Sequence, residues 1–318
     1  MDVTTWAKDW LHRWHIHPRR WLAGFVSYPR FLGYVRPQLI TVWEEEFLVR
    51  RKLLARAWEP RQLLTPVGKR ILVLCPHPDD EAIGAGGLLL AHRDRSEIHL
   101  VCLSNGEGGG RLAQPETNTE TAKSRMVETR RAEFRKTADM LRAASVRHLD
   151  FPDGGIPCSA AAVELLRSIV TAIRPDVVLL PWFLDGHVDH RRANVLYAWG
   201  CADLPALVLG YEVWSLLEPN AIMDISQHID AKLMLIRNYE SQLRTVDYVN
   251  FASGLARVRA YQFPTDVRRD GAVEAYVALP NHEYCRMVCQ LYGEAGSVGQ
   301  SALSLLKLRR AEQANATT

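Results

Sequence analysis

Several features that define a protein class by themselves are missing from this sequence. No stretch approaches the roughly 20 apolar residues of a membrane-spanning helix, and the N-terminus lacks the basic region, apolar core and small-residue cleavage site of a secretory signal. The six cysteines form no Cys-x-x-Cys pair. Cys285 and Cys289 stand four apart, but without a matching pair elsewhere they favour structural thiols over a metal site. These absences predict a cytoplasmic protein without a transmembrane segment.

An excess of charge of one sign is also lacking. The formal net charge is +3 over 318 residues, which does not indicate nucleic-acid binding, where clustered basic patches are expected. Hydrophobic residues make up 47% of the chain, enough to bury the core of one large α/β domain. The composition is that of an ordinary globular protein, and we predict no nucleic-acid partner.

Residues 1–68 differ in character from the rest of the chain. They contain six of the nine tryptophans, and the first 70 residues carry 13 Lys and Arg side chains against six acidic ones. Trp6, Trp10 and Trp14 are spaced to stack on one face of a helix. We predict a basic, Trp-rich helical extension over 1–68, which either packs on the main domain over 69–318 or contacts a membrane surface or a partner.

From Lys69 onward, apolar runs alternate with helical stretches, which is typical of βαβ units and a largely parallel sheet. We therefore predict an α/β fold, a Rossmann-like three-layer sandwich with a mostly parallel sheet. The expected strands are Ile71–Cys75, Ile98–Leu103, Val146–Leu149, Val177–Leu180 and Leu207–Val213, and the expected helices are Ala82–His92, Glu120–Ala143, Ala160–Ile173, Arg191–Cys201 and Ala231–Arg244.

Two clusters of acids and histidines follow predicted strands. Pro76-His77-Pro78-Asp79-Asp80-Glu81 comes directly after Ile71–Cys75, and Asp185-Gly186-His187-Val188-Asp189-His190 lies shortly after Val177–Leu180. Ligands of open α/β sheets bind outside the carboxyl ends of the strands. Both clusters are therefore expected to converge on one crevice.

The chemistry of the two clusters points to a catalytic metal. An imidazole and a carboxylate from the first, with an imidazole from the second, would give three ligands and leave a fourth position for water, as in catalytic zinc sites. Zinc lowers the pKa of its water toward about 7, and a carboxylate that is not a ligand can accept the proton. Asp79 and Asp80 provide one carboxylate to bind the metal and one to accept the proton. The alternative, that Asp79, Asp80 and Glu81 only cap the following helix, explains neither His77 nor the second cluster.

These residues also carry a family resemblance. Pro76-His77-Pro78-Asp79-Asp80-Glu81 resembles the Ala/Pro-His-Pro-Asp-Asp-Glu motif of the LmbE-like, PIG-L N-acetylglucosaminyl deacetylase family, and His187-Val188-Asp189-His190 resembles its His-x-Asp-His motif. The similarity runs from about Lys69 to about Leu243. It includes Arg130-Arg131-Ala132-Glu133, Asp150-Phe151-Pro152-Asp153-Gly154, Tyr211-Glu212-Val213-Trp214 and Tyr239-Glu240-Ser241-Gln242.

The resemblance implies how roles divide at the metal. His77, Asp80 and His190 would ligate Zn²⁺, while Asp79 would act as general base on the bound water. Position 185, where a binuclear His-x-His-x-Asp-His pattern places its first histidine, is Asp185. A single metal is therefore expected.

The resemblance also implies roles for side chains around the metal. His187 would stabilise the oxyanion or protonate the leaving amine. Asp189 would orient a metal-ligating histidine through the ring nitrogen that does not bind the metal. Arg130 would bind the substrate, with the neighbouring Arg131 as its competitor. The Gly-rich run Asn105-Gly106-Glu107-Gly108-Gly109-Gly110 follows a predicted strand and is expected to border the crevice as a mobile substrate loop.

Three functions are compatible with these patterns. The leading one is a zinc-dependent N-deacetylase that cleaves the acetamide of an N-acetylated amino sugar, a glycan or glycoconjugate, to a free amine and acetate. The second keeps the metal chemistry but acts as an amidase on a cysteine conjugate or an acylated natural product. The third is a non-catalytic binding subunit, which is disfavoured because every catalytic position is filled.

Overall fold

The computed structural model describes residues 61–63, 67–109, 119–263 and 271–293. All of them belong to the compact unit Arg50–Val298. The helical extension predicted over 1–68 therefore lies almost wholly outside the described residues. Among the residues that are described, no helix is long and apolar enough to cross a membrane.

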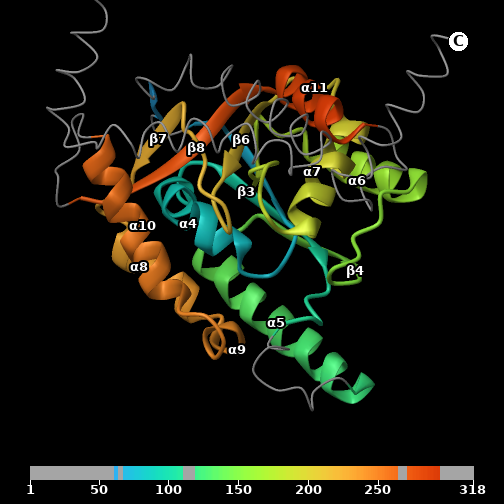
Figure 1. The fold of residues 1–318 in the computed structure, drawn as a ribbon, viewed down its shortest axis with the longest axis horizontal. Coiled ribbons are helices and arrows are strands. Elements are labelled where there is room, and N and C mark those ends of the chain that lie inside the picture. Colours follow the sequence, from blue (N-terminus) through green and yellow to red (C-terminus); the bar gives the residue numbers. More distant parts are fainter. Residues whose placement is uncertain (1–60, 64–66, 110–118, 264–270, 294–318) are drawn as a thin grey trace, which may run out of the picture. The chain divides into compact units, whose positions relative to one another are not determined.

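One mixed sheet of eight strands organises this unit (Figure 1). The strand order is β1-β7-β8-β6-β5-β2-β3-β4, and β8 runs antiparallel to both of its neighbours while the other pairs are parallel. The predicted α/β fold with a mostly parallel sheet is confirmed. The strands are β1 Arg61–Gln62, β2 Arg70–Cys75, β3 Glu97–Ser104, β4 Ser145–Phe151, β5 Val177–Pro181, β6 Leu207–Tyr211, β7 Ala221–Asp224 and β8 Val273–Pro280.

Helices cover both faces of the sheet, which completes the three layers (Figure 1). One face is covered by α6 (Ala160–Ile173), α7 (Val188–Cys201) and α11 (Asn281–Tyr292). The opposite face is covered by α4 (Asp80–His92), α5 (Glu120–Met140), α8 (Ile229–Arg237), α9 (Glu240–Leu243) and α10 (Tyr248–Gln262).

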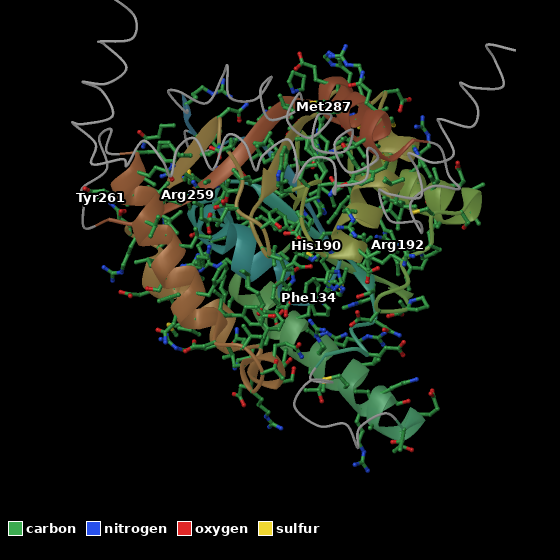
Figure 2. All side chains as sticks on the ribbon, viewed as in Figure 1. Phe134, His190, Arg192, Arg259, Tyr261 and Met287 are labelled. Atoms are coloured by element: carbon green, nitrogen blue, oxygen red, sulfur yellow. The ribbon has the colours of Figure 1, made fainter. Side chains whose placement is uncertain are left out.

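The central strand β2 shows why this sheet needs cover on both sides. Ile71, Val73 and Cys75 belong to the core beneath α4, which also contains Phe134 of α5 (Figure 2). The intervening residues of β2 are equally inaccessible on the other face. Such a continuous apolar run is typical of a parallel strand buried on both faces.

The predicted elements are present with small changes in their bounds. The five predicted strands coincide with β2 to β6 within two residues at each end. The predicted helix Ala231–Arg244 is two helices, α8 and α9, separated at Asn238 and Tyr239. Strands β7 and β8 and helices α10 and α11 were not predicted. The sheet also includes β1, which lies before the expected domain boundary and pairs in parallel with β7.

Strand β8 was missed because a charged residue interrupts its apolar sequence. Glu274 is buried, and its carboxylate lies 2.6 Å from Nζ of Lys232 on α8. It also accepts hydrogen bonds from the Tyr276 hydroxyl and from two backbone N–H groups of α4. The paired charge therefore ties β8 to the helices that cover it.

Helix α4 packs closely on the sheet because it has glycine at the points of contact. A Cβ atom on Gly84 would lie 2.1 Å from Cδ2 of Tyr211, which is fully buried at the end of β6. The Tyr211 hydroxyl in turn donates to the Leu74 carbonyl in β2. A larger residue at position 84 would push α4 away from the strand ends that carry the first cluster.

This close approach predicts a strong effect of Gly84→Ala on stability. We expect a decrease in the free energy of unfolding of about 1–3 kcal/mol or more, because the added methyl overlaps Tyr211. Gly254→Ala is the matched control, because Gly254 lies within α10 and a Cβ there meets nothing within 4 Å. It is expected to raise stability by up to about 1 kcal/mol. Equal urea midpoints for both variants would contradict the packing argument.

Candidate metal-dependent active site

The two predicted clusters meet at one cavity beyond the carboxyl ends of the strands. The cavity has a volume of about 230 Å³ and is lined in its polar part by His77, Asp79, Asp80, Arg130, Asp153 and His187. Two further residues of the second cluster, Asp189 and His190, are fully buried and contact His77 and Asp80. The expected convergence on one crevice is confirmed.

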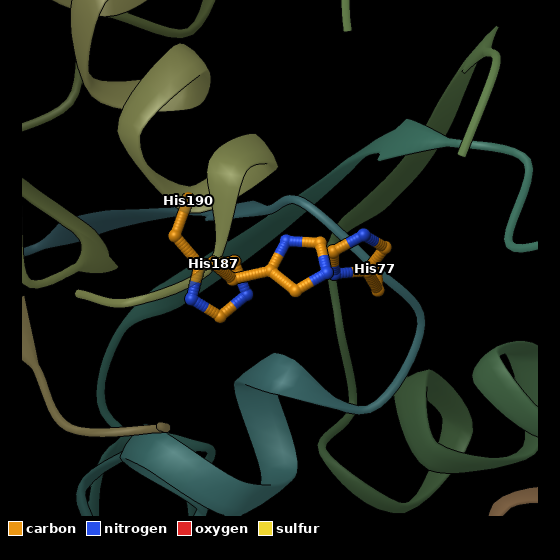
Figure 3. A group of neighbouring side chains, drawn as sticks. All are labelled: His77, His187 and His190. Carbon is orange, nitrogen blue, oxygen red and sulfur yellow. The ribbon is translucent and has the colours of Figure 1, made fainter. Parts of the chain in front are cut away.

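Three imidazole rings come together in this cavity (Figure 3). His77 follows β2, while His187 and His190 belong to the first turn of α7. The ring centroids of His77 and His187 are 4.6 Å apart, those of His187 and His190 are 5.0 Å apart, and those of His77 and His190 are 5.5 Å apart. Nitrogen atoms of all three rings lie within 4.8 Å of one another, so they form a candidate metal site.

The Asp80 carboxylate lies between two of these rings. Its Oδ2 is 3.3 Å from Nδ1 of His77, and its Oδ1 is 3.4 Å from Nε2 of His190. Tetrahedral bonds of about 2.0–2.2 Å place ligand atoms about 3.3–3.6 Å apart. Each separation, measured to one oxygen of Asp80, is therefore of the size expected between two ligands of one ion.

The two ring nitrogens of His190 are compatible with a bound metal ion. Both are buried and lack a hydrogen bond with acceptable geometry among the described residues, although Nδ1 lies 3.1 Å from Oδ1 of Asp185. A buried ring nitrogen without a well-formed hydrogen bond is costly. A metal ion on Nε2 would supply the missing interaction, so the donor set fits a metal.

Carboxylates face the outer nitrogens of both ligand-type histidines. Nε2 of His77 is 3.2 Å from Asp189 and 3.4 Å from Asp153, and Nδ1 of His190 faces Asp185. Such partners fix the orientation of a metal-ligating imidazole and raise its basicity. Asp153 and Asp185 were quoted from the sequence without a role in the site. No sequence pattern would have shown that they lie behind these rings.

Asp79 faces a different partner from its neighbour Asp80. Its Oδ2 lies 3.1 Å from Nη2 of Arg130, whereas Asp80 contacts the histidines. The separation depends on an unusual backbone, because Asp79 has φ of 135° at the N-cap of α4. The Glu81 carboxylate accepts a hydrogen bond from the Asp79 backbone N–H at 3.2 Å and stabilises this turn.

The environment of Asp79 favours proton uptake. Burial raises the pKa of its carboxyl group to about 7, although the positive charge of Arg130 opposes the shift and the negative charge of Asp80 adds to it. A carboxylate with a pKa near neutrality is suited to accept a proton from water and to return it.

Arg130 is the buried member of the two neighbouring arginines. Only 3% of it is exposed, and it donates to the carbonyl oxygens of Pro78 at 2.6 Å and Gly106 at 3.3 Å. Arg131 instead points outward and pairs with Asp150. The family resemblance implied that Arg130 binds the substrate. In the structure Arg130 lies in the cavity wall, where it also contacts Asp79.

His187 has a defined orientation because it caps α7. Its Nδ1 accepts a hydrogen bond from the Asp189 backbone N–H at 3.1 Å. In a neutral ring the proton is then on Nε2, which can donate to a group in the cavity. Burial and the positive charges of His77 and His190 lower the pKa of His187, which favours this neutral form.

The Gly-rich run borders the cavity as expected, through Gly108 and Gly109. A side chain at either position would displace a side chain of the cavity wall, because a Cβ on Gly109 would lie 2.5 Å from Nε2 of Gln242. Gln242 also lines the cavity, and the preceding Ser241 is anchored to the Glu133 carboxylate by its backbone N–H and hydroxyl. Two of the motif segments quoted from the sequence, on α5 and α9, therefore form one wall.

Two imidazoles and a carboxylate lie close together, and a second carboxylate lines the same cavity, an arrangement that fits the site of a metal-dependent hydrolase. Residues 72–198 match the family model described as PIG-L: GlcNAc-PI de-N-acetylase. The diacetylchitobiose deacetylase of Thermococcus kodakarensis is 32% identical over 196 residues, which cover 55% of this chain and 70% of that protein. The chain belongs to the PIG-L, or LmbE-like, family of deacetylases.

Solved structures share the fold. An N,N′-diacetylchitobiose deacetylase from Pyrococcus horikoshii is similar with a TM-score of 0.57 at 24% identity, covering 76% of this chain and 94% of that one. The 4-carboxy-2-hydroxymuconate hydratase from Pseudomonas putida reaches a TM-score of 0.57 at 22% identity, covering 66% of this chain and 96% of that one. Because a hydratase has this fold as well, the fold alone does not specify the reaction.

The two arginines provide a test of the cavity wall. Arg130→Ala removes the cation beside Asp79 and the side-chain donor to the Pro78 carbonyl, so we expect a loss of about 3–5 kcal/mol in the free energy of unfolding. Arg131→Ala breaks only an exposed pair and is expected to cost less than about 1 kcal/mol. Chemical denaturation of both variants measures the difference, and a similar small loss in both would show that Arg130 does not hold the wall.

Proposed function

We propose that this protein is a zinc-dependent N-deacetylase that hydrolyses the acetamide of an N-acetylated amino sugar or its conjugate to a free amine and acetate. The observation that carries the proposal is the division between adjacent carboxylates: Asp80 lies between two imidazoles, while Asp79 faces Arg130 in the same cavity. The amino-sugar class is supported by the diacetylchitobiose deacetylase of Thermococcus kodakarensis.

Zinc is the proposed metal, with His77, Asp80 and His190 as its ligands. Nitrogen and carboxylate donors in a four-coordinate arrangement suit this ion. When bound, zinc polarises the substrate carbonyl and lowers the pKa of water toward about 7. Asp189 and Asp185 orient the two imidazoles from their outer nitrogens.

Asp79 is proposed to act as the general base. It takes a proton from the water that attacks the acetamide carbonyl, and its raised pKa lets it hold that proton near neutral pH. Arg130 fixes the carboxylate by the 3.1 Å contact to Oδ2. The proton can then be passed to the leaving nitrogen, which departs as a free amine.

His187 is proposed to stabilise the negative charge that develops on the carbonyl oxygen. The bond from the Asp189 backbone to Nδ1 leaves Nε2 as the donor that faces the cavity. A preorganised donor of this kind contributes typically about 10²–10³-fold in rate.

We also propose a cytoplasmic location, because all six cysteines are free, as in a reducing compartment.

The proposed ligand set predicts that substitutions of Asp80 and of His187 have different effects on zinc content. The wild-type protein is expected to hold about one zinc per chain. Asp80→Ala is expected to lose it, and His187→Ala to keep it, because only Asp80 lies between both ligand-type imidazoles. Elemental analysis of proteins purified without chelator gives the result. Loss of zinc in His187→Ala with retention in Asp80→Ala would favour the three-histidine set instead.

The reaction is tested by incubating the protein with N-acetylglucosamine, N,N′-diacetylchitobiose and other N-acetylated conjugates while assaying acetate and primary amine. Asp79→Asn is expected to retain zinc but to lose about 10²–10⁴-fold in kcat, because it cannot accept a proton. Asp203→Asn, at an exposed pair with Arg167, is the matched control and keeps full activity. Absence of acetate release from every N-acetylated sugar would overturn the substrate class, and an active Asp79→Asn would overturn the choice of base.

A further inference from the structure

Two aromatic side chains form the outer part of the cavity. Trp214 follows β6 and Tyr248 begins α10, and both line the cavity on the side of its apolar residues Val213 and Val246. Their rings pack edge to face, with centroids 5.9 Å apart at 76°. Trp214 is 52% exposed, the highest exposure among the residues that line the cavity.

The backbone that carries the exposed indole is held in a fixed position. The backbone N–H groups of Trp214 and Ser215 donate to Oδ2 of Asp185 at 2.9 and 3.0 Å, and the Gly186 N–H donates to the Ser215 hydroxyl at 3.0 Å. The other oxygen of Asp185 lies 3.1 Å from Nδ1 of His190. One buried carboxylate therefore fixes Trp214 relative to the proposed metal ligands, as expected of a preorganised binding surface.

The size of the cavity shows what Trp214 would contact. A volume of about 230 Å³ is below the roughly 300–1,000 Å³ of pockets that enclose a drug-sized ligand. The same cavity is lined by Asp79, Arg130 and Asp153 and by the aromatic pair. Trp214 is the most exposed of the lining residues, so a group attached to a sugar ring bound beside Asp79 would pass the aromatic pair on its way to solvent.

We propose that Trp214 and Tyr248 form a stacking platform for a second sugar ring linked to the N-acetylated one, so that the preferred substrates are oligosaccharides rather than free monosaccharides. This rests on the proposed deacetylase function. A pyranose ring has an apolar C–H face and a polar rim, which complements aromatic rings that have an apolar body and a polar end. Burial and the charges of Asp79 and Asp80 raise the pKa of Tyr248, so its hydroxyl stays protonated and can donate to the sugar.

The test compares kcat/KM for N,N′-diacetylchitobiose and for N-acetylglucosamine. Wild type is expected to prefer the disaccharide at least about tenfold, a difference of about 1.4 kcal/mol. Trp214→Ala is expected to lose about tenfold more on the disaccharide than on the monosaccharide, mainly through KM. Trp214→Phe retains an aromatic face and is expected to keep most of the preference. Leu216→Ala is the matched control, since Leu216 is 60% exposed on the same loop but is not part of the cavity wall.

The results separate this proposal from the proposed function. Equal losses on both substrates, or no loss on either, would overturn the platform while leaving the deacetylase intact. If wild type hydrolyses neither these two sugars nor any other N-acetylated sugar or conjugate, the proposed function fails; the platform is then decided by calorimetric titration of chitobiose and glucosamine into wild type and Trp214→Ala. Tighter binding of chitobiose that disappears in Trp214→Ala supports the platform, and equal binding by both proteins overturns it. Unchanged zinc content in Trp214→Ala shows that the effect does not arise from a disturbed metal site.

Discussion

The backbone turn between β2 and α4 sets the geometry on which the site depends. Two consecutive residues of a regular helix point their side chains about 100° apart, but both would still lie on the first turn of α4. Asp79 instead has φ of 135°, so its carboxylate reaches Arg130 while Asp80 reaches His77 and His190. A conformation of this kind costs on the order of 1–3 kcal/mol and persists only where its surroundings enforce it.

Several buried polar groups enforce that turn. Arg130 donates to the Pro78 carbonyl, and Glu81 accepts from the Asp79 N–H and contacts the Tyr239 hydroxyl. Burial raises the pKa of Glu81 to about 8, which favours its protonated form at neutral pH. Buried charged and polar groups add little net stability compared with apolar packing. Their presence here is explained by positioning two carboxylates for different tasks.

The sequence alone predicted the elements that alternate regularly and the residues that flank them. Strands β2 to β6 and the convergence of the two clusters followed from periodicity and from the parallel topology. The pairings of Asp185 with His190 and of Glu274 with Lys232 could not be predicted, because they join residues whose proximity depends on how helices dock on the sheet. Strand β8 was missed for the same reason, since Lys232 and the two backbone N–H groups of α4 that make its charge compatible with burial come from helices docked on the sheet.

The site has two parts that differ in how they depend on the fold. The proposed metal-binding part is built from the ends of β2 and β5 and the first turns of α4 and α7, all within the matched residues 72–198. The mouth is built by Trp214 and Tyr248, which lie beyond that range. Loops after the shared strands can change without moving the proposed metal ligands, and this is how one fold accommodates different substrates. Asp185 joins the two parts, because it contacts His190 with one oxygen and holds the Trp214 loop with the other.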